Sequence, residues 1–264
     1  MSDFITLVKW PGGKRALLKH ILPFVPSKFN RYYEPFVGGG ALFFALHPSQ
    51  AVLADSNAEL INCYKQVRDC PNAVIAHLLK LKNTKEDYYA IRASTSLEDV
   101  SRAARFIYLM TLSFNGIHRV NAQGLFNVPY SYNADAQPCD ANKIHAISTL
   151  LSTASLCEGD FESTVADAQE GDFIYFDPPY TVAHSNNGFL KYNAHIFSWS
   201  DQVRLAIVAR DLAERGCHVL ISNADHYSIR DLYDYFKPEI VTRASSIAAS
   251  NEHRRKITEC VFHN

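Results

Sequence analysis

The chain has 264 residues, of which 47% are hydrophobic and 20% are charged. This length and composition suit a globular protein with one α/β domain and a smaller inserted domain. No run of about 18 apolar residues is present, which excludes a membrane-spanning helix. The start of the chain lacks the apolar segment of a secretory signal, so we expect a cytoplasmic protein.

The formal net charge of −1 does not by itself indicate a partner. Affinity for a polyanion depends on local cationic clusters rather than on the total charge. Residues 1–35 contain six Lys and Arg residues against two acidic ones. A second basic cluster comprises Arg243, Arg254, Arg255 and Lys256. The two clusters can form one cationic face, although taken alone they are better explained as ordinary solvated charges.

Six cysteines are spread along the chain, and no two of them have the Cys-x-x-Cys spacing. The missing spacing argues against a structural zinc site. In a reducing compartment such cysteines are most simply free thiols. We therefore expect neither a metal ion nor a disulfide bond.

Strand-like and helical patterns alternate at the start of the chain, which indicates α/β organisation. Strands are predicted at residues 33–37 and 51–55. Helices are predicted at residues 41–46 and 57–67. In the second helix the apolar residues recur with helical spacing on one face. They are Leu60, Ile61, Tyr64 and Val67.

The middle of the chain is predicted to be helical from about residue 70 to residue 115. Two amphipathic stripes support this prediction. Residues 118–128 alternate around Gly124 as in a hairpin, and residues 130–142 form a polar loop. We interpret this block as an insertion between two halves of the α/β core.

The α/β pattern resumes in the last part of the chain. Strands are predicted at residues 155–158, 173–177, 218–222, 239–242 and 257–262. A polar loop is predicted at residues 181–195, and helices are predicted at residues 200–215 and 227–235. The N-terminal Ser200 and Asp201 of the first helix favour capping. Parallel strands joined by helices bind ligands at their carboxyl ends, so we expect the functional site at that edge.

The sharpest motif is Asp177-Pro178-Pro179-Tyr180, which directly follows an apolar strand. Two prolines cannot continue a strand, so the carboxylate lies at the strand's end beside a rigid turn. A planar exocyclic amine can donate to the Asp177 carboxylate and the Pro178 carbonyl, while the Tyr180 ring stacks on the base. The alternative is a strand-terminating turn with an exposed Asp, which is about equally compatible with the tetrapeptide alone.

Three weaker motifs accompany it. Glycine-rich residues 34–40 allow a ligand to approach the backbone at a strand–helix junction. Asp55 follows the next strand, where a carboxylate commonly accepts ribose hydroxyls, or else it caps the following helix. Residues 9–14 form a glycine turn flanked by cations, or simply a basic turn.

Together, in this order, these motifs resemble the DNA adenine methylase (Dam) family of N6-adenine methyltransferases, from about Leu7 to Phe262. Residues 9–14, KWPGGK, and residues 34–40, EPFVGGG, are similar to its two S-adenosylmethionine motifs. Residues 52–57, VLADSN, resemble its ribose-binding segment, and residues 158–161, EGDF, resemble the segment near the cofactor adenine. Asp-Pro-Pro-Tyr resembles its catalytic motif.

The middle block resembles the family's target recognition domain. Residues 115–121, NGIHRVN, and residues 124–130, GLFNVPY, are similar to the recognition hairpin of methylases that act at GATC. One position departs from the pattern, because related enzymes usually have glycine where this chain has Ser131. The resemblance implies a catalytic methyltransferase domain at residues 1–66 and 153–264 and a DNA-binding target recognition domain at residues 67–152.

The implied fold is an α/β, Rossmann-like S-adenosylmethionine-dependent methyltransferase fold. It has a mostly parallel sheet with one antiparallel strand and an inserted, mainly helical recognition domain with a β-hairpin. The implied catalytic residues are Asp177, Pro178 and Tyr180. The residues implied to contact the cofactor are Trp10, Lys14, Asp55 and Asp177, followed by Phe36, Gly38, Asp160 and Phe161. Those implied to face DNA are Lys9, Asn115, Ile117, Arg119 and Pro129.

The resemblance thus implies a site-specific DNA adenine N6-methyltransferase that flips its target base, with S-adenosylmethionine as cofactor and S-adenosylhomocysteine as product. We expect double-stranded DNA as partner, no membrane partner, and a prokaryotic or phage-encoded monomer in the cytoplasm. The same chemistry also suits cytosine N4, an RNA base or a side-chain amide. A catalytically silent DNA-binding homologue is a second alternative. A nicotinamide oxidoreductase is disfavoured because the Gly-x-Gly-x-x-Gly order is absent.

Overall fold

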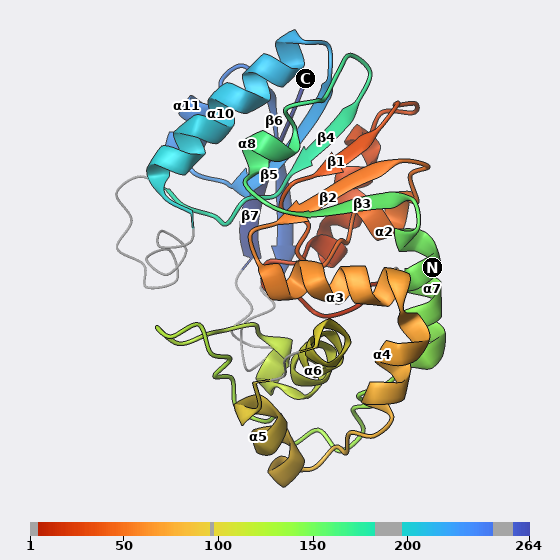
Figure 1. Cartoon of the computed structure of the whole chain (residues 1–264). Coiled ribbons are helices and arrows are strands. Elements are labelled where there is room, and N and C mark those ends of the chain that lie inside the picture. Colours follow the sequence, from red (N-terminus) through yellow and green to blue (C-terminus); the bar gives the residue numbers. More distant parts are fainter. Residues whose placement is uncertain (1–4, 96–97, 183–196, 245–255) are drawn as a thin grey trace. The chain divides into compact units, whose positions relative to one another are not determined.

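The computed structural model describes residues 5–95, 98–182, 197–244 and 256–264. Within these residues, seven strands form one sheet in the order β3-β2-β1-β4-β5-β7-β6 (Figure 1). The strands are β1 (Tyr32–Glu34), β2 (Ala51–Asp55), β3 (Ala154–Glu158), β4 (Phe173–Phe176), β5 (His218–Ala224), β6 (Lys237–Ala244) and β7 (Lys256–His263).

Strand directions agree with the predicted sheet. β1 is parallel to both β2 and β4, and β4 is parallel to β5. β7 is antiparallel to both of its neighbours, β5 and β6. The prediction of a mostly parallel sheet with one antiparallel strand is therefore confirmed. Because β1, β2 and β4 run in the same direction, their carboxyl ends lie along one edge of the sheet.

The chain divides into two compact units. The first comprises Met1–Gly13, Val37–His47 and Ala54–Glu158, and the second comprises Lys14–Phe36, Pro48–Leu53 and Gly159–Asn264. The domain boundaries inferred above from the family resemblance stay a prediction.

The first unit is mainly helical. Its helices are α2 (Phe43–Leu46), α3 (Ala58–Asp69), α4 (Pro71–Leu78), α5 (Lys85–Ala93), α6 (Asp99–Leu112), the short η3 (Phe114–Gly116) and α7 (Ala141–Leu151). α6 packs against α3, α4 and α5. The apolar stripe predicted for α3 is buried, and burying such side chains supplies most of the stability of an amphipathic helix.

The helical stretch predicted at residues 70–115 is interrupted. The Thr84 hydroxyl accepts the Asp87 amide and begins a new helix there, and Ser94 has an extended backbone after α5. Asn115, with φ of 56°, breaks the helical geometry after α6. Capping and left-handed backbone therefore divide a region that periodicity alone joined.

The predicted hairpin at residues 118–128 is present as a short, irregular ribbon. Val120 and Phe126 form an antiparallel bridge. The Asn127 amide donates to the Arg119 carbonyl, and the Asn121 amide donates to the Leu125 carbonyl. Gly124 has a φ of 76°, a conformation that glycine adopts without steric cost.

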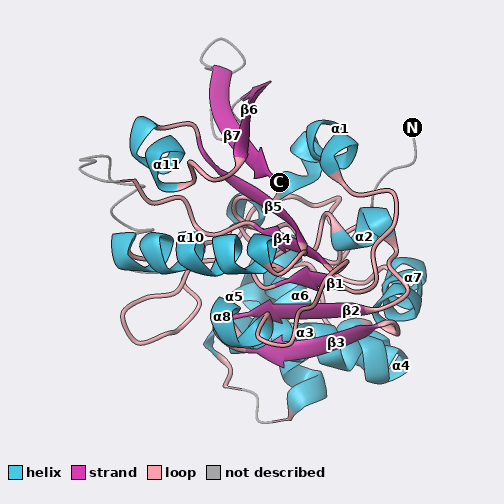
Figure 2. Ribbon diagram, turned by 90° about the horizontal axis from the view of Figure 1, so that it is seen from above, coloured by secondary structure: helices cyan, strands magenta, loops and turns pink. Residues whose placement is uncertain are grey.

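The second unit carries its helices beside the sheet. They are η1 (Lys14–Leu17), α1 (Leu18–Ile21), η2 (Leu22–Phe24), α8 (Phe161–Thr164), α10 (Trp199–Glu214) and α11 (Tyr227–Leu232). α10 packs against β5 and α8 (Figure 2). It begins one residue earlier than predicted, because Ser198 rather than Ser200 caps it in a capping box with Asp201.

Some predicted features lie outside the described residues. They are residues 183–195 of the polar loop, Arg254 and Arg255, and the side chains of Arg243 and Lys256. Among the helices that the structure describes, none combines the length and apolar character needed to cross a bilayer.

Candidate active site

The predicted catalytic motif follows β4 directly. Asp177 comes after the buried strand residue Phe176, and the Pro178-Pro179 pair ends the strand as expected. The Lys14 ammonium lies 2.7 Å from a carboxylate oxygen of Asp177, and these side chains are only 7% and 16% exposed. Lys14 is the first residue of η1. The glycine turn that precedes η1 thus places a cation beside the Asp177 carboxylate.

Tyr180 is held by charged groups on two sides. The Lys14 ammonium lies 4.8 Å from the centre of the Tyr180 ring, within the range of a cation–π interaction. The Tyr180 hydroxyl donates a hydrogen bond to the Glu259 carboxylate of β7. Burial, together with the nearby carboxylates of Asp177 and Glu259, holds the pKa of Tyr180 well above its ordinary value. The phenol therefore stays a hydrogen-bond donor at neutral pH.

A fully buried glutamine on α10 holds the middle of the same turn. The Gln202 amide donates to the Pro179 carbonyl over 3.3 Å. Its own oxygen accepts from the Asn223 amide and from the Tyr233 hydroxyl, at 3.0 and 3.1 Å. Neither Gln202 nor Glu259 was predicted from the sequence as a site residue. The signal for Gln202 was a polar residue on the apolar stripe of α10.

The glycine-rich loop after β1 is tied to Asp55. The Gly38 amide donates to one Asp55 oxygen at 3.0 Å, and the Asn57 amide donates to the other at 2.9 Å. Burial raises the pKa of Asp55, while these backbone amides oppose the rise. The Asn57 side chain caps α3 by accepting the Leu60 amide, so the alternative role of Asp55 as the helix cap is wrong.

Trp10 lies against the same loop. A side chain at position 38 would meet the indole of Trp10 at 2.6 Å, and Gly38 has a φ of 45°, so only glycine fits there. The Trp10 ring also stacks on His118, with ring centres 5.1 Å apart. The first unit therefore brings together Trp10, Gly38 and Asp55 from three separate predicted motifs.

Phe36, Asp160 and Phe161 form another cluster, in the second unit. Phe36 and Phe161 stack with ring centres 5.6 Å apart. Asp160 caps α8 and binds the Arg204 guanidinium through both of its oxygens, at 2.6 and 2.7 Å. The hydrogen bonds from Arg204 lower the pKa of Asp160. The Arg204 guanidinium also lies 4.1 Å from the centre of the Phe161 ring.

The residues expected to face DNA gather around the predicted hairpin of the first unit. All five, namely Lys9, Asn115, Ile117, Arg119 and Pro129, are exposed. The aliphatic part of Lys9 covers Gly116, where a side chain would meet it at 2.9 Å. Arg119 donates to the Asn127 side chain at 2.7 Å, and the Pro129 carbonyl accepts the Phe114 amide.

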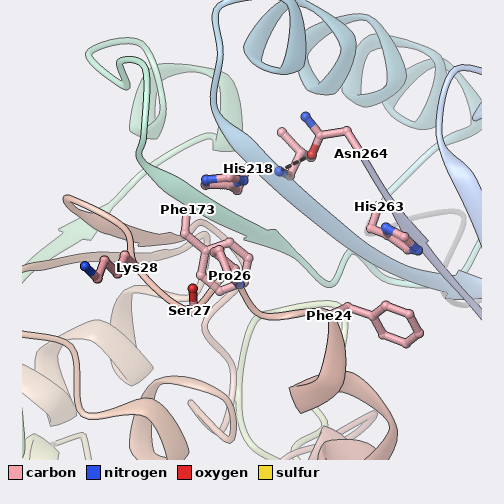
Figure 3. A pocket seen from close by; sticks show the side chains of 9 residues that line it. Phe24, Pro26, Ser27, Lys28, Phe173, His218, His263 and Asn264 are labelled. Carbon is pink, nitrogen blue, oxygen red and sulfur yellow. Dashed lines mark hydrogen bonds between the residues drawn. The ribbon is translucent and has the colours of Figure 1, made fainter.

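A pocket of about 350 Å³ lies elsewhere in the second unit, at the amino ends of β4 and β5. Phe173 and His218, the first residues of these strands, line it together with Phe24, Lys28 and His263 (Figure 3). None of the predicted site residues lines this pocket, and Asp177 follows the opposite end of β4. Among the described residues, no group of three or more His, Cys, Asp or Glu side chains is arranged to hold a metal ion.

The fold and the residues at the strand ends define a class. A mostly parallel seven-stranded sheet with one antiparallel strand, a glycine loop after β1 and an acidic turn after β4 are the features of a Rossmann-like methyltransferase. The family model for D12 class N6 adenine-specific DNA methyltransferases matches residues 10–247. The chain therefore belongs to this family, as the sequence resemblance predicted.

Relatives along the whole chain agree with this assignment. The chain is 41% identical to the Type II methyltransferase M1.LlaDCHI of Lactococcus lactis subsp. cremoris, over 97% of this chain and 94% of that protein. It is 32% identical to the Type II methyltransferase M.MjaIII of Methanocaldococcus jannaschii, over 94% of each. It is also 32% identical to the DNA adenine methylase of Escherichia coli strain K12, over 96% of this chain and 92% of that protein.

Proposed function

We propose that this chain is a site-specific enzyme that transfers the methyl group of S-adenosylmethionine to N6 of an adenine in double-stranded DNA. We propose GATC as the target sequence and a flipped-out adenine as the substrate. The observation that carries the proposal is the turn after β4, where Asp177 is paired with Lys14 and followed by the anchored Tyr180. Membership of the adenine-specific family supports the choice of base and polymer.

The donor set fits S-adenosylmethionine. Asp55 accepts the amides of Gly38, Ser56 and Asn57. An ionised carboxylate has about four acceptor sites, so Asp55 keeps capacity for a ribose hydroxyl. Gly38 presents backbone without a side chain. When bound, the cofactor supplies an electrophilic methyl group on a sulfonium.

We assign the remaining cofactor contacts by resemblance. Trp10, Lys14 and Asp177 join Asp55 as the principal contacts. Phe36, Gly38, Asp160 and Phe161 follow as contacts of second rank, of which Phe36 and Phe161 offer stacked rings suited to a purine. The Asp160 oxygens already accept from Arg204, so Asp160 contributes mainly by ordering the start of α8.

The turn after β4 acts on the target amine. The Asp177 carboxylate and the Pro178 carbonyl each accept a hydrogen bond from one N–H of the amine. These two bonds draw the nitrogen lone pair out of conjugation with the ring. Lys14 holds the carboxylate in place, and Tyr180 stacks on the base. Flipping a base out of a duplex costs a few kcal/mol of unstacking and unpairing free energy. Alignment of two bound reactants can contribute about 7–11 kcal/mol in favourable systems, so positioning supplies most of the catalysis.

Residues 67–152 form the proposed target recognition domain, and residues 1–66 and 153–264 form the proposed catalytic domain of a cytoplasmic monomer. Lys9, Asn115, Ile117, Arg119 and Pro129 are the proposed DNA contacts. Of these, Arg119 is suited to guanine, because a guanidinium can donate to O6 and N7 together, which discriminates by about 1–3 kcal/mol.

Expression in a host that lacks adenine methylation tests the function. Its genomic DNA is digested with nucleases that require, or are blocked by, N6-methyladenine at GATC. We expect protection from the blocked nuclease and cleavage by the dependent one. Transfer of labelled methyl groups to DNA, RNA and protein in parallel measures the substrate class. Labelling of cytosine, RNA or protein in place of adenine in DNA would overturn the proposal.

A further inference from the structure

Glu259 is a buried carboxylate that the proposed chemistry leaves without a role. It lies on β7, between its cross-strand neighbours Ala224 of β5 and Val241 of β6. Its exposed fraction is 1%. An ionisable side chain is rarely fully buried unless it is paired, because removing its charge from water is costly.

The acceptor of the Tyr180 hydroxyl is this carboxylate. Tyr180 is the last residue of the catalytic turn, and Glu259 lies far along the chain on the antiparallel strand. A hydrogen bond to a charged acceptor is stronger than one between neutral groups. An aromatic ring otherwise turns readily about its terminal torsion, which has a broad energy well. The hydroxyl oxygen lies on the axis of that torsion, so the bond fixes the position of the far end of the ring and biases its tilt only because the phenolic O–H prefers the plane of the ring.

Two further contacts make the restriction directional. The Lys14 ammonium lies over the Tyr180 ring at 4.8 Å from its centre, and the same ammonium pairs with Asp177. The carboxylates of Asp177 and Glu259 thus lie at the two ends of one chain of contacts that runs through Lys14 and the ring. Stacking on a base favours particular offsets and tilts of the ring, so a ring plane that is set in advance favours binding of the base.

We propose that Glu259 is a positioning residue for methyl transfer, which fixes the ring of Tyr180 in the orientation that receives the extruded base. This inference rests on the proposed function of Tyr180, and Glu259 itself touches no reacting atom. Its action passes through the Tyr180 hydroxyl. The burial-raised pKa of Tyr180 is consistent with this, because the hydroxyl keeps its proton for the bond.

A double-mutant cycle tests the coupling. Glu259→Leu and Tyr180→Phe each remove one end of the bond. The double variant removes both ends, so that neither end of this bond is left without the other. We expect each single variant to lower kcat about 2- to 150-fold, which corresponds to the range of coupling between contacting side chains. The double variant should be no slower than either single one. Glu259→Gln retains an acceptor oxygen and should recover most of the rate.

A matched control separates positioning from stability. Tyr175 lies on β4, the strand that leads to the turn, and its buried hydroxyl is hydrogen-bonded to Ser222 of β5 at 2.9 Å. Tyr175→Phe removes this hydroxyl. It should lower the melting temperature without lowering kcat. If Glu259→Leu lowers kcat by the same factor whether or not Tyr180→Phe is also present, or lowers only the melting temperature, the proposed role of Glu259 is wrong.

A direct readout keeps this test independent of turnover. The protein is labelled with 3-fluorotyrosine, and the signal of residue 180 is assigned by its loss in Tyr180→Phe. We expect Glu259→Leu to broaden or split that signal, while Glu259→Gln leaves it single. An unchanged signal in Glu259→Leu overturns the inference. Absence of DNA methylation by the unmodified chain, with the fluorine result as expected, would instead overturn only the proposed function.

Discussion

The proposed catalytic turn, residues 177–180, and the proposed recognition segment, residues 114–130, are held in place by different contacts. Buried side chains from distant parts of the chain, Lys14, Gln202 and Glu259, anchor the turn. Main-chain bonds within the proposed recognition segment hold it together with contacts from Trp10, Tyr88 and Asn83, while Phe114, Ile117 and Leu125 are exposed.

This difference predicts which substitutions should lower the free energy of unfolding. A preorganised catalytic group gains its effect because the fold has already set its environment. The turn is built in that way, so changes there should alter stability and turnover together. Exposed side chains of the recognition segment contribute little to the fold, so changes there should alter DNA recognition alone.

The largest effect is expected at Asp177. Asp177→Ala removes the proposed acceptor of the target amine, and methyl transfer should fall by about 10²- to 10⁴-fold, the range for positioned proton-transfer groups. The substitution also removes the ion-pair partner of the Lys14 ammonium, which lies 2.7 Å from the Asp177 carboxylate. Removing one partner of a buried pair typically costs about 3–5 kcal/mol, so the free energy of unfolding should fall as well. Steady-state kinetics and urea unfolding measure the two effects.

A double variant distinguishes the two effects at Asp177. Asp177→Ala combined with Lys14→Met removes the unbalanced charge, so we expect much of the stability to return while methyl transfer stays lost. Near-normal turnover in either variant would contradict the assigned role of Asp177. An undiminished free energy of unfolding in the single variant would contradict the view that the fold supports this turn through buried charges.

The next largest effect is expected at Gln202. Gln202→Met removes its bonds to Pro179, Asn223 and Tyr233. A buried polar group left without a partner costs about 1–3 kcal/mol, so we expect the free energy of unfolding to fall by about 3 kcal/mol or more. Turnover should fall too, because the turn loses an anchor. Val203→Met, on the exposed face of the same helix, is the control, and equal melting temperatures would refute the expectation.

The two regions were also unequally predictable from the sequence. The strands that end at Asp55 and Asp177 were located almost to the residue, because short apolar runs bounded by acidic or proline residues are local signals. Such signals also located the glycine loop at Gly38. The anchors of the catalytic turn left no comparable signal. Glu259 becomes a neighbour of Tyr180 only because β7 inserts between β5 and β6, a pairing that chain order does not reveal.

Local backbone chemistry accounts for the other differences. Helical periodicity joined residues 70–115, since periodicity does not register the left-handed backbone of Asn115. The helix after the polar loop was predicted to begin at Ser200, but it begins at Trp199. Two serines near its start can act as caps, and in the structure the Ser198 hydroxyl accepts the Asp201 amide. The Asp160–Arg204 pair was missed because its partners lie far apart in the chain.

A smaller effect, confined to recognition, is expected at Arg119. This side chain is exposed and rests on Asn127, so Arg119→Ala should change the free energy of unfolding by less than about 0.5 kcal/mol. We expect it to lose about 1–3 kcal/mol of discrimination between GATC and sites with a replaced guanine. Binding of both DNAs across a salt series measures this. Equal weakening for both, with a shallower salt dependence, would show that Arg119 contacts only phosphate.

The smallest effect is expected at Arg204, which lies in the same unit as the catalytic turn but pairs with Asp160 at the surface. The hydrogen bonds from Arg204 hold the pKa of Asp160 below its ordinary value. A carboxyl with a lowered folded pKa stabilises the fold above its unfolded pKa of about 3.9, and this stabilisation is lost as the pH falls through the folded value. The Arg204 and Asp160 side chains are 38% and 47% exposed, so solvent should limit the contribution to under about 1 kcal/mol.

Arg204→Met should therefore raise the pKa of Asp160 towards its ordinary value, which carbon NMR of the carboxyl group measures, and lower the free energy of unfolding at pH 7 only slightly. At a pH below both pKa values the variant and the parent chain should differ even less. Arg210→Met, which breaks an exposed pair with Glu214 on the same helix, is the control. A loss at Arg204 as large as that of Asp177→Ala would mean that burial does not distinguish the two pairs. The Lys14–Asp177 and Arg204–Asp160 pairs lie in one unit and differ chiefly in their access to water. Equal losses would therefore mean that access to water does not set how much an ion pair contributes to the stability of this unit.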